Sequence, residues 1–159
     1  DVIDFLNQNL EVKRLEDLQI PMIITATDFD RGRSVHFREG PLPELIAASC
    51  CVPILFSPIE IEGTHYVDGG VLMNLPVSPL RDICQKVVAI NVSPLVAPEY
   101  KMNIISIAER AYHFMFRSNT VPQRTMADLL IEPTILYEFS DMDLDKTEEM
   151  LGYMAEVLL

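Results

Sequence analysis

A strand-like segment that ends in an aspartate and two glycines most constrains how this chain can fold. The segment is HYVDGGVLMNLPV, residues 65–77. A carboxylate is costly to bury, and two consecutive glycines weaken a strand. One interpretation makes Asp68 the capping residue of an ordinary turn. In the other, Asp68 is a carboxylate presented for chemistry, and Gly69 and Gly70 let another backbone or a ligand come close.

The residues before Asp68 predict a β-hairpin with a two-residue turn at Glu62-Gly63. Its register sets three cross-strand pairs: Ile61 with Thr64, Glu60 with His65, and Ile59 with Tyr66. Since side chains alternate between faces, Asp68 shares the apolar face and His65 lies on the opposite one. We therefore predict a surface pairing of His65 with Glu60, and no His-Asp pair between His65 and Asp68.

The rest of the chain predicts strands in alternation with helices. Strands are expected at 21–28, 34–37, 86–92 and 127–133, and helices at 1–10, 43–51, 102–117 and from 143–145 onward. The continuous apolar run at 86–92 is typical of a strand covered on both faces. This alternation indicates an α/β sheet with helices on its faces, and 159 residues suit one domain.

Composition excludes several classes of partner. The formal net charge is −12 and no cluster of Lys or Arg occurs, which argues against nucleic acid and against capture by anionic lipid. No run of about 18 apolar residues suggests a spanning helix. The three cysteines (Cys50, Cys51 and Cys84) lack metal-ligand spacing, so we expect reduced structural thiols, no metal and no cofactor.

Several motifs in order along the chain point to one family. They are the strand that ends in ATD (26–28), the turn at Gly32, V-x-F-x-x-G (35–40), Ala48-Ser49 with Pro53, the Phe56 and Pro58 pair, and DGG (68–70). The ending ADLLIEPTILYEFSDMD (127–143) and Gly152-Tyr153 continue the pattern. Over essentially its whole length the sequence resembles the patatin-like phospholipase family. The resemblance implies a three-layer arrangement, in which helices cover both faces of the sheet.

The resemblance also implies roles for the Asp-Gly-Gly motif. In that family a serine in G-x-S-x-G attacks the ester carbonyl, and the aspartate is its partner in a dyad without histidine. Asp68 would be the general base, with Gly69 and Gly70 supporting it. A carboxylate is a weak base in water, so such a site must desolvate it and raise its pKa. The inward face derived for Asp68 suits this requirement.

No G-x-S-x-G occurs in the 159 residues, and the glycine-rich segment that supplies oxyanion donors in such enzymes does not occur either. Gly32-Arg33-Ser34 does not fit a nucleophile elbow, and the resemblance implies a structural role for Ser49. We interpret residues 1–159 as the carboxyl-terminal portion of one patatin-like domain, without a nucleophile of its own. The prediction is part of a lipid acyl hydrolase acting on a lipid or acyl-ester substrate. The alternatives are a non-catalytic binding or regulatory module, and a structural α/β domain in which DGG is a turn.

The same interpretation predicts partners and location. Without the amino-terminal segment, the strand at 21–28 or the strand at 86–92 should keep an unpaired edge, which recruits other chains. We expect association with that segment or with a second copy. The helix at 102–117 has a predicted core stripe of Ile104, Ile105, Ala108, Ala111, Tyr112 and Met115. This stripe is widened by Ile107, Phe114 and Phe116, which would form either a partner surface or a lipid entrance. The expected location is cytoplasmic, or peripheral at a membrane surface.

Overall fold

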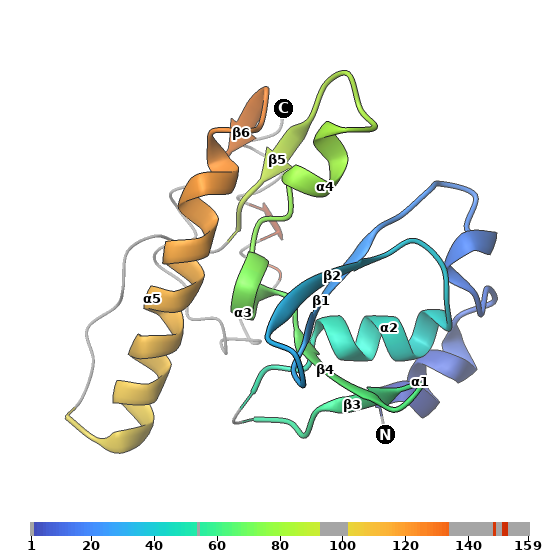
Figure 1. Ribbon diagram of the computed structural model, residues 1–159, viewed down its shortest axis with the longest axis horizontal. Helices are drawn as coiled ribbons and strands as arrows, with labels where there is room; N and C mark the ends of the chain where they lie inside the picture. Colours follow the sequence, from blue (N-terminus) through green and yellow to red (C-terminus); the bar gives the residue numbers. More distant parts are fainter. Residues whose placement is uncertain (1, 54, 93–101, 134–147, 149–150, 153–159) are drawn as a thin grey trace.

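The computed structural model describes residues 2–53, 55–92, 102–133, 148 and 151–152 (Figure 1). The helices are α1 (Val2–Asn9), a short 3-10 turn η1 (Leu15–Asp17), α2 (Leu42–Ser49), α3 (Gly70–Met73), α4 (Ser78–Arg81) and α5 (Ile104–Arg124). The strands are β1 (Ile24–Asp28), β2 (Arg33–Phe37), β3 (Ile59–Ile61), β4 (Thr64–Asp68), β5 (Val88–Ile90) and β6 (Leu129–Ile131). The predicted α/β class is confirmed. The described strands form two sheets, however, where the sequence suggested one.

The larger sheet is antiparallel and has the strand order β2-β1-β4-β3. The hairpin of β3 and β4 has the predicted register, with Glu60 opposite His65. Its turn residues Glu62 and Gly63 both have positive φ, 51° and 75°, as a tight hairpin turn requires. β4 then pairs with β1, so that Ala26 stands opposite Asp68. Asp68 therefore lies next to the central strand of this sheet.

One hydrophobic core packs α2 against the larger sheet. Its buried members are Leu15, Ile24, Leu42 and Leu45, with partly buried Phe37 and Ile61 packed around them. Phe37 stands opposite Ile24 on β2, and the strand parity puts Asp68 on this same face. The predicted placement of Asp68 on the apolar side of the sheet is thus confirmed. In Figure 1, α2 runs alongside the sheet.

Asp28 is a second acid on this face, and arginines satisfy it. Its side chain is fully buried, and its Oδ2 accepts hydrogen bonds from Arg33 Nε at 3.0 Å and Arg31 Nη1 at 3.2 Å. The backbone N–H of Arg31 donates to Oδ1 at 3.1 Å. Burial opposes ionisation, but the hydrogen bonds from Arg33 and Arg31 outweigh it and lower the pKa of Asp28. Asp28 therefore fixes the turn between β1 and β2.

The smaller sheet pairs β5 and β6 in parallel. Ala89 is buried, but Val88 and Ile90 are 56% and 50% exposed, so the predicted cover on both faces is wrong for the described residues. One face of this sheet packs against described residues. Val87 and Ala89 form a buried core there with Leu75 and Val77. Of the two strands that could keep an open edge, β1 has a neighbour on each side, and β5 has a neighbour on one side only within the described ranges.

α5 extends seven residues beyond the predicted end at 117. Asn103 caps its start by accepting a hydrogen bond from Ser106 N at 2.9 Å. The predicted core stripe is wrong at Ile104, which is 87% exposed, and at Ala111, which is also exposed. The predicted start of a final helix at 143–145 lies outside the described residues, although residues 148, 151 and 152 are helical.

We predict that Asp28→Asn destabilises the fold in a pH-dependent way. The folded-state pKa of Asp28 lies below its ordinary value of 3.8, so its contribution is present above about pH 4 and disappears as the pH falls through the folded pKa. Urea unfolding should show a clear loss for the variant at neutral pH and a smaller one near pH 3. Asp82→Asn, at an exposed carboxylate, is the control. An equal loss at both pH values would contradict the assignment.

Candidate functional site

The backbone of Asp68 is fixed on both sides where β4 ends. Its N–H donates to Cys51 O at 2.9 Å, just beyond the end of α2. Its carbonyl accepts a hydrogen bond from Thr27 Oγ1 of β1 at 3.0 Å. Thr27 is buried, so this bond is shielded from water. Asp68 is thus held by the strand beside it and by the segment that follows α2.

The carboxylate of Asp68 is half-buried and has one hydrogen-bond donor among the described residues. Gly70 N–H donates to Oδ1 at 2.7 Å. The other oxygen, Oδ2, has no hydrogen-bond partner within the part of the chain that the structure describes. Burial raises the pKa of Asp68, and the hydrogen bond from Gly70 offsets only part of this effect. The side chain is therefore a stronger base than a carboxylate in water.

The lack of room for a side chain explains why both residues 69 and 70 are glycines. A Cβ on Gly69 would lie 2.4 Å from the carbonyl oxygen of Thr25, which is backbone of β1 and cannot move aside. A Cβ on Gly70 would lie 3.0 Å from Asp68 Oδ1 and 3.0 Å from Phe116 Cε1 of α5. Gly69 has φ −61°, so close approach, and not a positive φ, requires glycine here. Gly69 thus lets the backbone of β1 come close, whereas the atoms closest to Gly70 belong to side chains.

Polar side chains on α5 hold α3 in place. Asn119 Nδ2 donates to the carbonyls of Gly70 and Val71 at 2.8 and 3.2 Å, and its Oδ1 accepts from Asn74 N at 2.8 Å. Asn74 Nδ2 in turn donates to Thr120 Oγ1 at 3.4 Å. The turn after Asp68 is therefore clamped by a helix about 50 residues further along the chain. The sequence motifs gave no sign of this clamp.

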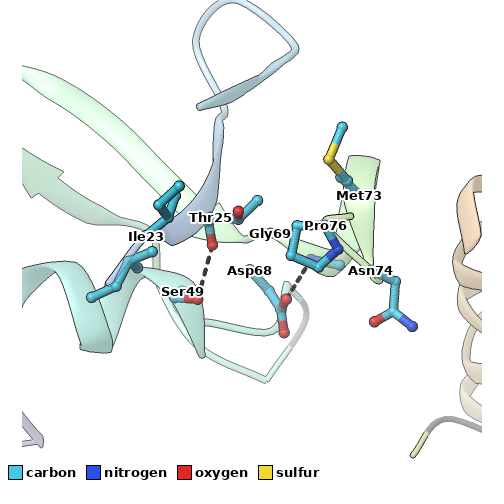
Figure 2. A pocket seen from close by; sticks show the side chains of 10 residues that line it. Ile23, Thr25, Ser49, Asp68, Gly69, Met73, Asn74 and Pro76 are labelled. Carbon is cyan, nitrogen blue, oxygen red and sulfur yellow. Dashed lines mark hydrogen bonds between the residues drawn. The ribbon is translucent and has the colours of Figure 1, made fainter. Parts of the chain in front are cut away.

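An open pocket of about 270 Å³ lies next to Asp68 (Figure 2). Its lining comes from the start of β1, the end of α2 and the α3 region: Ile23, Ile24, Thr25, Ser49, Asp68, Gly69, Gly70, Met73, Asn74 and Pro76. Ser49 lines it too, but its hydroxyl donates to Thr25 O at 2.8 Å. This bond ties α2 to β1, and it agrees with the structural role that the resemblance implied for Ser49.

The prediction that the side chain of His65 pairs with Glu60 is wrong. Its Nδ1 lies 3.2 Å from Asp30 Oδ1, and its backbone N–H donates to Asp30 Oδ2 at 3.0 Å. The turn after β1 brings Asp30 to the start of β4, and the hydrogen bond from the His65 backbone fixes it there. Hairpin register alone does not reveal this contact. The prediction that His65 lies on the face opposite Asp68 is confirmed by the strand register.

Cys50 and Cys51, which follow α2, are free thiols. Cys51 is buried and its Sγ donates to Ser57 O at 3.0 Å, while Cys50 is exposed. Burial, together with the charge of Asp68, raises the pKa of both thiols. Within the described ranges, no group of three or more His, Cys, Asp or Glu side chains is arranged to hold a metal ion. No helix there is long and apolar enough to cross a membrane.

Comparison with known proteins gives the family. The family profile described as patatin-like phospholipase matches residues 2–81, which include the whole Asp-Gly-Gly motif. This match covers about half of the 159 residues. The chain belongs to the patatin-like phospholipase family. The matched residues contain the larger sheet, α2 and the carboxylate of Asp68, so the pocket beside this acid is built mainly from the family's part of the chain.

Curated relatives are similar to about half of the chain. Proteins named as uncharacterized NTE family proteins, from Mycobacterium bovis and Mycobacterium tuberculosis, are each 35% identical over 82 residues. The match covers 52% of this chain and 23% of each of those proteins. The lysophospholipase NTE1 of Cryptococcus neoformans is 32% identical over 68 residues, which is 43% of this chain and 4% of that protein. The chain thus matches under a quarter of the length of these relatives.

We predict that Gly69→Ala destabilises the domain by about 1–3 kcal/mol, because the added methyl group meets the Thr25 carbonyl and the backbone must shift. Urea unfolding monitored by circular dichroism measures the loss. Gly152→Ala is the matched control, since a Cβ there meets nothing within 4 Å and alanine favours a helix. Equal stability of the two variants would show that the motif does not need glycine for space.

Proposed function

We propose that this chain is part of a serine acyl hydrolase in which Asp68 is the general base of a Ser-Asp dyad. The observation that carries the proposal is the state of the Asp68 carboxylate. It is half-buried with a raised pKa, one oxygen is held by Gly70 N–H, and the other has no partner within the described residues. A base of this kind can take a proton from a hydroxyl and return it. Family membership supports the reaction class.

The reaction has two halves. Asp68 Oδ2 accepts the serine proton while the serine Oγ forms a bond to the ester carbonyl carbon. The carbon–oxygen bond to the alcohol then breaks, and the proton on Asp68 passes to the departing oxygen. Water, deprotonated by Asp68, attacks the acyl-serine and releases the acid, and the proton returns to serine. The hydrogen bond from Gly70 orients the carboxylate, so that Oδ2 is left to exchange the proton.

The serine is proposed to come from a segment outside these 159 residues, since no G-x-S-x-G occurs within them. Two observations support this. The curated relatives are more than four times longer than the part matched here. The edge of β5 has no neighbouring strand among the described residues, and the exposed Val88 and Ile90 lie on that strand. A further parallel strand can pair there, as the resemblance implies for the strand that precedes the nucleophile.

The proposed substrate is a lipid or another acyl ester, and the proposed setting is cytoplasmic or peripheral at a membrane surface. The relative named lysophospholipase supports a lipid substrate. The partners proposed for the open edge of β5 are the serine-bearing segment first and a second copy next. The second candidate function is a non-catalytic binding or regulatory module. The lack of a nucleophile motif within the 159 residues favours it.

We predict that the 159-residue chain by itself does not hydrolyse p-nitrophenyl esters above the background rate. Asp68 then has no hydroxyl nucleophile to activate, and the oxyanion donors are not supplied. Release of p-nitrophenolate by rigorously purified chain measures this. Hydrolysis well above that of a mock purification would contradict the proposal that the serine lies outside these 159 residues.

In protein that carries the serine-bearing segment, Asp68→Asn should lower kcat by about a hundredfold or more, because an amide cannot accept the serine proton. The shape is nearly unchanged, so thermal unfolding should stay close to that of the wild type. His65→Ala is the matched control, since His65 is on the opposite face and should keep most of the activity. An Asp68→Asn protein with full activity would contradict the role of Asp68 as the base, whereas a wild type without activity would favour the binding-module alternative.

A further inference from the structure

Asn74 presents an unused acceptor to the pocket beside Asp68. It follows α3 directly, and its side chain is one of those that line the pocket (Figure 2). Its Nδ2 donates to Thr120 Oγ1 at 3.4 Å, and the proton of that hydroxyl is itself donated to Phe116 O at 2.8 Å. Thr120 can therefore only accept from Asn74, which fixes the orientation of the amide. Asn74 Oδ1 is turned the other way and makes no hydrogen bond to any described residue.

The side-chain oxygen of Asn74 lies close to the carboxylate of Asp68. A Cβ on Gly70 would be 2.9 Å from Asn74 Oδ1 and 3.0 Å from Asp68 Oδ1, so both oxygens border the same small space. All three residues line the pocket. Asp68 Oδ2 is a second oxygen without a partner among the described residues. The pocket thus presents two acceptors that the described residues do not use, and a ligand that satisfies both must bring two donors.

The remaining polar groups of the pocket narrow the choice of ligand. Ser49 Oγ donates to Thr25 O, and Thr25 Oγ1 is bonded to His36 Nδ1 at 3.0 Å. Among the described residues that line the pocket, none is Lys or Arg. A phosphate group there would face two oxygen acceptors and no cation, so an anion is disfavoured. An ammonium group would pair with Asp68 and keep it from accepting a proton. Hydroxyl groups are uncharged donors, and they suit both oxygens.

We propose that Asn74 is a specificity-determining residue that accepts a hydrogen bond from a free hydroxyl on the alcohol part of the ester. This rests on the proposed hydrolase function. In that reaction Asp68 passes its proton to the departing alcohol oxygen, so this oxygen lies at Asp68. A hydroxyl two carbons further along the alcohol then reaches Asn74 Oδ1, on the other side of the same small space. The substrate class is thus a partly acylated polyol, such as a glycerol monoester, and not the ester of a simple alcohol.

The test compares two butyrate esters in protein that carries the serine-bearing segment. Glycerol 1-monobutyrate has a free hydroxyl two carbons from the ester oxygen, and propyl butyrate has the same carbon chain without it. Release of butyric acid in a pH-stat gives kcat/KM for each ester, divided by its rate of alkaline hydrolysis. Wild-type protein should prefer the glycerol ester by about two- to tenfold, which is the effect of one hydrogen bond between neutral groups. Equal values would overturn the role of Asn74 alone, whereas hydrolysis of neither ester would contradict the proposed function.

Asn74→Ala should remove this preference. It should lower kcat/KM for the glycerol ester by about two- to tenfold and leave the propyl ester within about twofold. Asn7→Ala is the matched control, because it removes the same amide from an exposed position on α1 and should change neither value. An equal loss on both esters for Asn74→Ala would show a structural role through the bond to Thr120, and would overturn the proposal. The wild-type preference needs no variant, so it tests the proposal even where Asn74→Ala does not fold.

Discussion

The close passage of the chain over β1 at Gly69 is the constraint on which the site depends. Here the Cβ position of residue 69 lies 2.4 Å from a backbone carbonyl of β1, so only hydrogen fits. Because the backbone can come this close, β4 ends at Asp68 and α3 begins at once, with Gly70 N–H directed at the carboxylate. A side chain at 69 would push α3 away from β1 and take that donor with it. The position of the Asp68 carboxylate thus depends on the close packing of Gly69 against β1.

Two aspartates on one face of the sheet show how local donors set basicity. Asp28 and Asp68 both lie at strand ends on the face that packs α2. Two arginines and a backbone N–H surround Asp28, and its pKa falls although it is fully buried. Among the described residues, Asp68 has one backbone N–H and no cation bonded to its carboxylate, so burial dominates and its pKa rises. One acid is thereby fixed as a structural anion, and the other is left able to exchange a proton.

Local patterns in the sequence were sufficient for the parts that local chemistry controls. The hairpin register followed from the two-residue turn, and the face of Asp68 followed from strand parity. The partner of His65 did not, because Asp30 comes from the turn after another strand. The clamp by Asn119 joins residues nearly 50 positions apart, and no motif marks it. β5 has the composition of a strand covered on both faces, yet only one face packs against described residues, because composition does not say what covers a face.

The site is built from two distant parts of the chain, and this affects how changes outside it act. Asn119 and Phe116 lie within one turn of α5, and both bear on Gly70. Asn119 Nδ2 donates a hydrogen bond to the Gly70 carbonyl, and Phe116 Cε1 would lie 3.0 Å from a Cβ at that position. Tyr112 lies one turn earlier on the same helix and packs on Phe116. A shift of α5 along α3 therefore strains the contacts that hold Gly70, which is the donor to the Asp68 carboxylate. The geometry of the Asp68 carboxylate thus depends on the contact between α3 and α5, and a substitution at that contact affects the acid even where it does not touch it.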